Sequence, residues 1–171
     1  MSIVPYTTGS RWPTVLASLL IIFTFSFLLH ELAHKFSAQH FGLWAEFRLT
    51  RFGAIITLLS MFLPFFKIIS PGAVIIVGPV TKETAGKTAL SGPLTNIALS
   101  TLCIIFLISF QNSFFRTVSV FGAWINAFIA FFNLIPFGMM DGFKVFLWDK
   151  IIWIIVFFLS VSLTIITYSY L

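Results

Sequence analysis

Residues 27–36 read FLLHELAHKF and place two histidines and a glutamate at the end of a long apolar run. His30 and His34 are four residues apart, so on a helix both imidazoles project from one face, about one turn apart. Two nitrogens in that arrangement can bind one tetrahedral zinc ion, and Glu31 is close enough to take a proton from a water that the metal activates. Charged side chains are costly inside a bilayer and usually mark function. The stretch therefore predicts a zinc site, and a polar helix end that reaches the membrane surface is the simpler alternative.

The composition around this stretch is that of a membrane protein. The chain has 171 residues, of which 59% are hydrophobic and 9% are charged, whereas average globular chains have about 25% charged residues. Several apolar runs exceed the roughly 20 residues that cross a bilayer core. We expect a single domain, residues 1–171, with about four transmembrane helices, near residues 12–39, 82–110, 115–134 and 149–170.

The segment between the first two helices has a different pattern. Residues 41–50, FGLWAEFRLT, alternate between apolar and polar side chains, and residues 72–78, GAVIIVG, form a short β-branched run between turn residues, so both predict strands. Residues 52–69 are apolar but are interrupted by Pro64 and carry Lys67, which favours a re-entrant hairpin over a fifth span. The predicted fold is therefore an all-α polytopic membrane protein with a small membrane-edge β element between helices one and two.

The distribution of basic residues predicts the orientation in the membrane. The loops on the side where the first helix ends would hold eight of the ten cations, and the opposite side would hold the other two, Arg11 and Arg116. The eight are Lys35, Arg48, Arg51, Lys67, Lys82, Lys87, Lys144 and Lys150. Because cytoplasmic loops are rich in Lys and Arg, we expect the HELAH end to face the cytoplasm and both termini to lie outside, in the cell membrane. The net charge of +5 is then explained by loop topology, and no nucleic-acid partner is expected.

A catalytic zinc site needs a third protein ligand. Asp141, in the stretch NLIPFGMMDGF, follows a broken helix and has no adjacent cation before Lys144. Four other candidates have simpler explanations at the membrane surface, in a strand or at a helix start: His40, Glu46, Glu83 and Asp149. Elimination therefore favours Asp141, although it could instead be the N-cap of the helix that follows.

A third polar segment is expected at the same depth. Residues 91–96, SGPLTN, begin the second helix; Gly92 permits close helix approach, and Asn96 places an amide just inside the membrane. His30 and His34 close the first helix on that side, and Asp141 follows the third helix on its return. Polar residues from three helices are thus expected to form one site.

Taken together, these motifs resemble the site-2 protease family of intramembrane zinc metalloproteases. HELAH (30–34), NLIPFGMMDG (133–142) and SGPLTN (91–96) match three segments of that family's pattern. The resemblance implies that His30, His34 and Asp141 bind Zn²⁺ and that Glu31 is the general base of this HExxH-type endopeptidase. It also implies that Asn96 holds the substrate or stabilises the oxyanion, and that Asn133 is structural or faces the substrate.

The chain departs from many members of that family in two respects. Gly138, Met139 and Met140 precede the Asp-Gly pair in place of proline and leucine, and we expect a minimal core without a PDZ or nucleotide-sensing domain. The expected activity is hydrolysis of a peptide bond within or near a transmembrane segment of a membrane protein substrate. Two alternatives are an inactive membrane-embedded pseudo-protease that binds proteins and a metal-ion transporter. The intact set of motif residues disfavours the first, and the clustering of polar residues at one end of the helices disfavours the second.

Overall fold

The computed structural model describes residues 12–49, 72–109 and 112–171. Four helices in these ranges are long and apolar enough to cross a membrane. They are α1 (Trp12–His40), α3 (Lys82–Ser109), α4 (Ser113–Asn133) and α6 (Lys150–Tyr168). A helix satisfies its backbone hydrogen bonds internally, as a span in lipid requires. The prediction of a multi-pass, mainly helical membrane protein is confirmed, and the predicted helix boundaries agree with the structure to within two residues.

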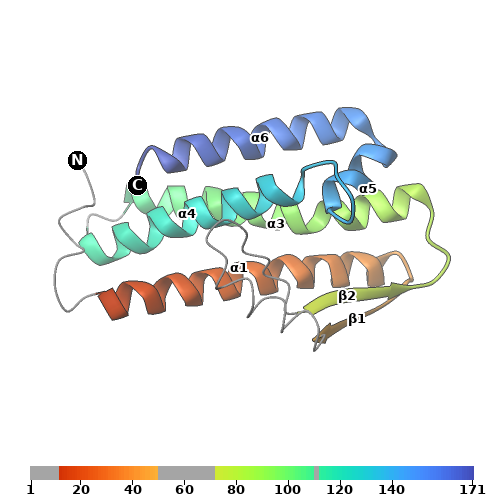
Figure 1. Ribbon diagram of the computed structural model, residues 1–171, viewed down its shortest axis with the longest axis horizontal. Helices are drawn as coiled ribbons and strands as arrows, with labels where there is room; N and C mark the ends of the chain where they lie inside the picture. Colours follow the sequence, from red (N-terminus) through yellow and green to blue (C-terminus); the bar gives the residue numbers. More distant parts are fainter. Residues whose placement is uncertain (1–11, 50–71, 110–111) are drawn as a thin grey trace.

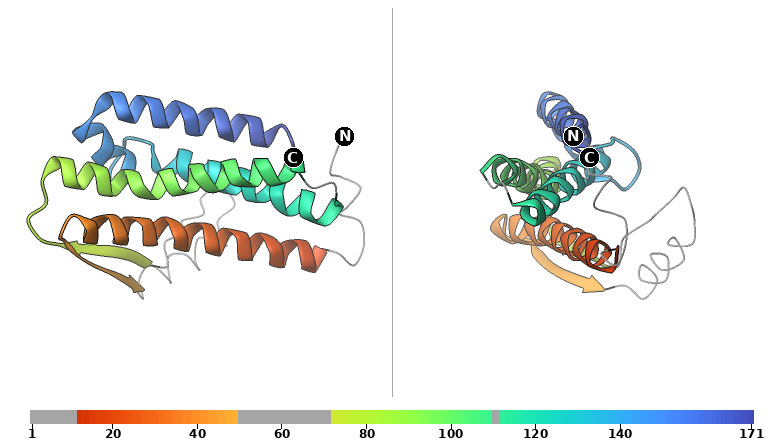
Figure 2. Two further views of the ribbon diagram at one scale, coloured as in Figure 1. Left: turned by 180° about the vertical axis from the view of Figure 1, so that it is seen from behind. Right: turned by 90° about the vertical axis from the view of Figure 1, so that its left-hand side faces the viewer.

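The helices form a bundle in which α3 and α4 pack against each other in the middle, with α1 on one side and α6 on the other (Figures 1 and 2). A short helix, α5 (Asp141–Trp148), packs against α3 and α6. The end of α1, the two strands, the start of α3 and α5 all lie at the same end of the bundle (Figure 1). The sequence did not predict α5 as a separate helix. Asp149 separates it from α6, because its side chain accepts hydrogen bonds from the first amides of that helix.

The strands β1 (Trp44–Leu49) and β2 (Gly72–Val77) pair antiparallel, with Trp44 opposite Val77 and Leu49 opposite Gly72. The alternation expected for the first strand is present, since Ala45 is buried while Trp44, Glu46 and Arg48 are exposed. The apolar face packs on the last turns of α1 through a cluster of Ala38, Leu43, Ala45, Phe41, Val74 and Ile76. The predicted β element is therefore present. The re-entrant hairpin predicted at residues 52–69 lies outside the described residues.

Gly42 ends α1 and turns the chain into the first strand. Its φ of +73° is left-handed, a conformation that glycine adopts without a steric penalty. The Gly42 amide donates to the Gln39 carbonyl at 2.9 Å, and the Leu43 amide donates to the Ala38 carbonyl at 3.0 Å. This is a Schellman motif, and the accompanying contact of Leu43 with Ala38 is its usual apolar closure. The motif fixes the direction in which the hairpin leaves the helix.

Replacing Gly42 should therefore weaken this junction. We expect Gly42→Ala to lower stability by about 1–2 kcal/mol, the cost of a left-handed residue with a Cβ, and Gly42→Asn to lower it less, because asparagine tolerates that conformation. Thermal unfolding in detergent measures both variants. Equal stability of wild type and Gly42→Ala would contradict the assignment.

Candidate metal centre

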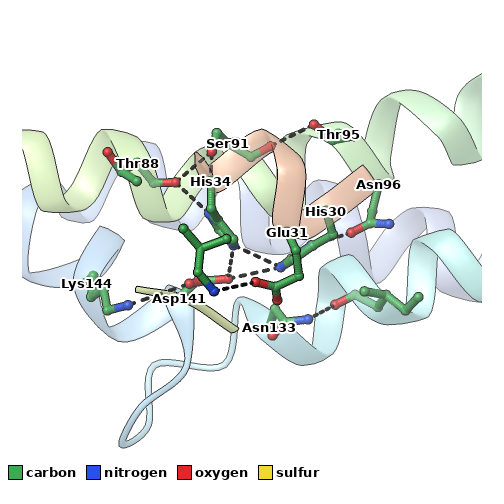
Figure 3. A network of polar contacts seen from close by, with 12 residues as sticks. His30, Glu31, His34, Thr88, Ser91, Thr95, Asn96, Asn133, Asp141 and Lys144 are labelled. Carbon is green, nitrogen blue, oxygen red and sulfur yellow. Dashed lines mark hydrogen bonds and ion pairs between the residues drawn. The ribbon is translucent and has the colours of Figure 1, made fainter. Parts of the chain in front are cut away.

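Three potential ligands meet in the interior of the bundle: His30 and His34 from α1, and Asp141 from α5 (Figure 3). The Oδ2 atom of Asp141 lies 3.3 Å from Nε2 of His30 and 3.0 Å from Nε2 of His34. The two Nε2 atoms are 3.0 Å apart. Both histidines are buried, and the side chain of Asp141 is 13% exposed. The residues that the sequence predicted as ligands are therefore brought together at one point.

Gly92 on α3 makes room for the two imidazoles. A Cβ at this position would overlap His34 Nε2 and would lie 2.6 Å from Cε1 of His34 and 2.7 Å from Cε1 of His30. Such distances are well inside van der Waals contact. The close approach expected at Gly92 thus has a specific cause, because the backbone of α3 forms the wall against which both rings rest.

Asp141 is held by the way α5 packs against the end of α4. The next residue, Gly142, is buried so close to the Leu134 carbonyl that a Cβ would overlap it. The same carbonyl accepts a hydrogen bond of 2.9 Å from the indole Nε1 of Trp153 on α6. Met140, not Asp141, occupies the N-cap position of α5. The N-cap alternative for Asp141 is therefore wrong, and its carboxylate is directed at the histidines instead.

The charge state of Asp141 suits a metal ligand. Burial by itself raises the pKa of this carboxyl, but positive charge at the neighbouring His34 outweighs burial and lowers the pKa well below its usual value whenever a positive charge lies at the cluster. Lys144, one turn along α5, places its Nζ 3.9 Å from Oδ1. Both effects keep the carboxylate ionised, which is the form that coordinates a cation.

The Nδ1 atoms of the two rings make hydrogen bonds to oxygen acceptors, so the Nε2 atoms are available to bind a cation. His34 Nδ1 lies 2.8 Å from the Thr88 carbonyl, and His30 Nδ1 lies 2.6 Å from Oδ1 of Asn96. A carbonyl can only accept, so the ring proton faces it and the Nε2 lone pair points to Asp141. Two nitrogen lone pairs and a carboxylate oxygen that face one another repel unless a positive charge lies between them. Imidazole and carboxylate are ligands of tetrahedral catalytic zinc, so these donors fit Zn²⁺.

Glu31 lies next to the first ligand and faces the hairpin. Its Oε2 accepts a hydrogen bond of 3.3 Å from the Val74 amide of β2, and its side chain is half-buried. It is adjacent in sequence to His30 and lies beside the ligand cluster in Figure 3. A carboxylate so placed can exchange protons with a group bound at the cluster.

Asn96 contacts three other helical residues in the interior of the bundle. Asn96 is fully buried, and its Nδ2 donates to the Ser26 carbonyl on α1 and to Oδ1 of Asn126 on α4. A residue that stabilises an oxyanion must direct a donor at the reacting carbonyl. The amide hydrogens of Asn96 point at neighbouring helices, and its oxygen contacts His30. The role that the resemblance implies for Asn96 stays a prediction.

Among the described residues, no hydrogen bond or ion pair joins the remaining candidates to His30, His34 or Asp141. Asn133 ends α4, and its Nδ2 donates to the Ile129 carbonyl of the same helix at 2.9 Å. The residues set aside by elimination are at the surface, paired within their own strand or helix, or at a helix terminus: His40, Glu46, Glu83 and Asp149.

Sequence reasoning missed three contributors behind the histidines. Thr88 contributes its backbone carbonyl, which no side-chain pattern can reveal. The Ser91 hydroxyl donates to that same carbonyl at 2.7 Å. Asn126 is 3% exposed in the middle of α4. Its signal was present in the sequence, because an amide inside an apolar span is costly without a partner.

These features define the class of the protein: a multi-pass membrane protein in which two histidines and an aspartate, next to a glutamate, lie close enough together to hold a metal ion. A protein of Methanocaldococcus jannaschii described as "Putative zinc metalloprotease" is 40% identical over 132 residues, which cover 76% of this chain and 69% of that protein. The chain belongs to the same family, and zinc metalloprotease is the activity that its relative's description gives. No family model matches the chain, and no solved structure matches it.

The close contact at Gly92 yields a direct test of the geometry. We expect Gly92→Ala to displace both imidazoles and to lower the zinc content of purified protein from about one ion per chain to near zero. Thr95→Ala is the matched control, because within the described residues the hydrogen bond of Thr95 Oγ1 stays inside α3, where it donates to the Ser91 carbonyl. Metal analysis measures both variants. Full zinc content in Gly92→Ala would show that the rings do not bind metal in this arrangement.

Proposed function

We propose that the chain is an intramembrane zinc metalloprotease of the site-2 protease type, which hydrolyses a peptide bond within or near a transmembrane segment of another membrane protein. One observation carries the proposal: His30, His34 and Asp141 converge beside Glu31 inside a bundle of membrane helices. His30 lies ten residues before the end of α1, about 15 Å along the helix axis. A peptide bond that reaches the cluster must therefore enter the bundle.

His30, His34 and Asp141 would hold the zinc ion, and Glu31 would act as general base and general acid. When bound, zinc supplies Lewis-acid chemistry, which makes a water nucleophilic at neutral pH and polarises a peptide carbonyl. Glu31 takes the proton from the attacking water and returns it to the departing amine. Glu31 is half-buried and adjacent to His30 in α1, so the same carboxylate can serve both proton transfers from one position.

The second strand offers a way to present the substrate. A transmembrane helix hides its amides in internal hydrogen bonds, so it must unwind before hydrolysis. The Val74 amide donates to Glu31, so the edge of β2 turned away from β1 faces the catalytic carboxylate. An extended substrate segment that pairs with this edge is held by main-chain hydrogen bonds, whatever its side chains are.

The distribution of basic residues between the two ends of the bundle supports an orientation in the membrane. The cations of the described residues lie mainly on elements at the metal-site end, including Lys35, Lys82, Lys87 and Lys144, while Arg116 lies in the first turn of α4 at the other end (Figure 1). This asymmetry supports a site that opens to the cytoplasm, with both termini outside the cell membrane. Substrates would be cut near their cytoplasmic ends.

Glu31→Gln tests the assigned chemistry. We expect this variant to keep its zinc, because Glu31 is not a ligand, and to lose cleavage by about 10²–10⁴-fold, the usual contribution of a general acid–base group. The assay is mass spectrometry of a panel of single-span test proteins whose spans contain helix-weakening residues. Unimpaired turnover in Glu31→Gln would sink the assignment.

Ile76→Pro tests substrate pairing with β2. Alternation along the strand directs the Ile76 amide to the same edge as that of Val74, and proline removes this donor while the ladder to β1 remains. We expect cleavage to slow about two- to tenfold, the value of one main-chain hydrogen bond, with zinc content unchanged. Ile76→Val keeps the amide and should keep the rate. Equal rates in wild type and Ile76→Pro would refute pairing at this edge.

A further inference from the structure

Two buried asparagines connect His30 to the backbone of α4. Asn126 Nδ2 lies 2.8 Å from the Gly122 carbonyl, and Asn126 Oδ1 lies 2.9 Å from Nδ2 of Asn96. Asn96 Oδ1 in turn lies 2.6 Å from His30 Nδ1. The chain of contacts thus runs from a backbone carbonyl on α4, through α3, to the metal-site ring on α1.

Each contact in this chain allows one direction of hydrogen bonding only. The Gly122 carbonyl cannot donate, so the amide NH₂ of Asn126 must face it and the oxygen of Asn126 must face Asn96. That oxygen requires the NH₂ of Asn96, which leaves the oxygen of Asn96 toward His30. The contact of Asn96 Nδ2 with the Ser26 carbonyl, at 3.3 Å, requires the same orientation. His30 must then carry its proton on Nδ1.

The surroundings make this direction hard to reverse. Asn96 is 0% exposed and Asn126 is 3% exposed, and the membrane interior supplies no water that could accept a misplaced hydrogen. Turning over either amide would set two acceptors or two donors against each other at hydrogen-bond distance. The neutral His30 ring is therefore left with its lone pair on Nε2, the atom that faces His34 and Asp141.

We propose that Asn126 and Asn96 form a directional amide relay that fixes the tautomer of His30 and presents its Nε2 lone pair to the metal. Asn126 is a positioning residue, since it touches neither the ligand cluster nor Glu31 and acts through Asn96. The effect of the relay on zinc affinity rests on the proposed function. Its effect on the tautomer of His30 does not, because the tautomer is measured in the metal-free protein.

The relay is tested by ¹⁵N NMR of the metal-free protein with labelled histidine, which distinguishes the two neutral tautomers. The chain has three histidines, so His30 can be assigned with a His30→Gln variant. We expect wild type to carry the His30 proton on Nδ1. Asn126→Leu removes the nearer of the two acceptors that orient Asn96 and leaves only the 3.3 Å contact with the Ser26 carbonyl, so a measurable share of His30 should move its proton to Nε2. Asn126→Ala removes the same acceptor and carries the test if the leucine variant does not fold.

Zinc affinity, measured by competition with a chelator, is the second readout. We expect Asn126→Leu to bind zinc 10–100-fold more weakly, the usual effect of losing a group that orients a metal-binding histidine. Asn126→Asp is the conservative rescue. Whether ionised or protonated, its carboxyl group offers Asn96 an acceptor, so the tautomer and affinity of wild type should return.

Ser100→Ala controls for a purely structural effect. Ser100 Oγ donates to the Ala123 carbonyl at 2.8 Å, so it is also a buried hydrogen bond between α3 and α4, one turn from Asn96 and outside the relay. We expect it to leave the tautomer and the affinity unchanged. An unchanged His30 tautomer in both Asn126→Leu and Asn126→Ala, or an equal loss of affinity in Ser100→Ala, would overturn the relay. A wild type that binds no zinc would contradict the proposed function, and the tautomer comparison would still decide the relay.

Discussion

The arrangement of the whole bundle depends on three acceptor atoms that face one another in an apolar interior. Nε2 of His30, Nε2 of His34 and Oδ2 of Asp141 lie within 3.3 Å of each other. In water such a group would be solvated and dispersed, whereas between membrane helices it must find a positive charge. A cation at this point links α1 to α5 across the bundle. The candidate metal centre is therefore also a contact between helices, and the elements around it bring its three residues together.

Glycines allow the elements around the histidine–aspartate cluster to approach one another closely, both on α3 and next to Asp141. A Cβ would overlap Trp148 at Gly86, the two imidazoles at Gly92 and the Leu134 carbonyl at Gly142. Small residues are the usual means by which membrane helices approach closely, because lipid gives no hydrophobic incentive to pack large ones together. Here the three contacts bring α5 onto α3, the histidines onto α3 and Asp141 onto the end of α4. The depth and direction of each ligand follow from these contacts.

The sequence was most informative where a residue type is costly in its setting. His30, His34 and Asp141 could be predicted because few residues of the chain can bind zinc and each lies beside an apolar span, and the strands could be predicted from their alternation. Helix α5 and the contacts of Asn96 could not be predicted, because both depend on segments that are distant in the sequence. The Nδ2 of Asn96 donates to the Ser26 carbonyl and to Oδ1 of Asn126, and both of these partners come from other helices. The predicted ligand roles of His30, His34 and Asp141 remain predictions, as do the predicted roles of Glu31, Asn96 and Asn133.

The most direct test of the central claim is the zinc content of protein purified in detergent, compared among wild type, His30→Ala and Asp141→Ala. The measurement requires no knowledge of the substrate, and the two variants remove ligands from different helices, so each tests a separate half of the site. The account predicts about one zinc ion per chain in wild type and a loss or sharp reduction in both variants. A wild type that cannot be loaded with zinc, or an Asp141→Ala variant that binds it as well as wild type, would contradict a metal centre shared by α1 and α5.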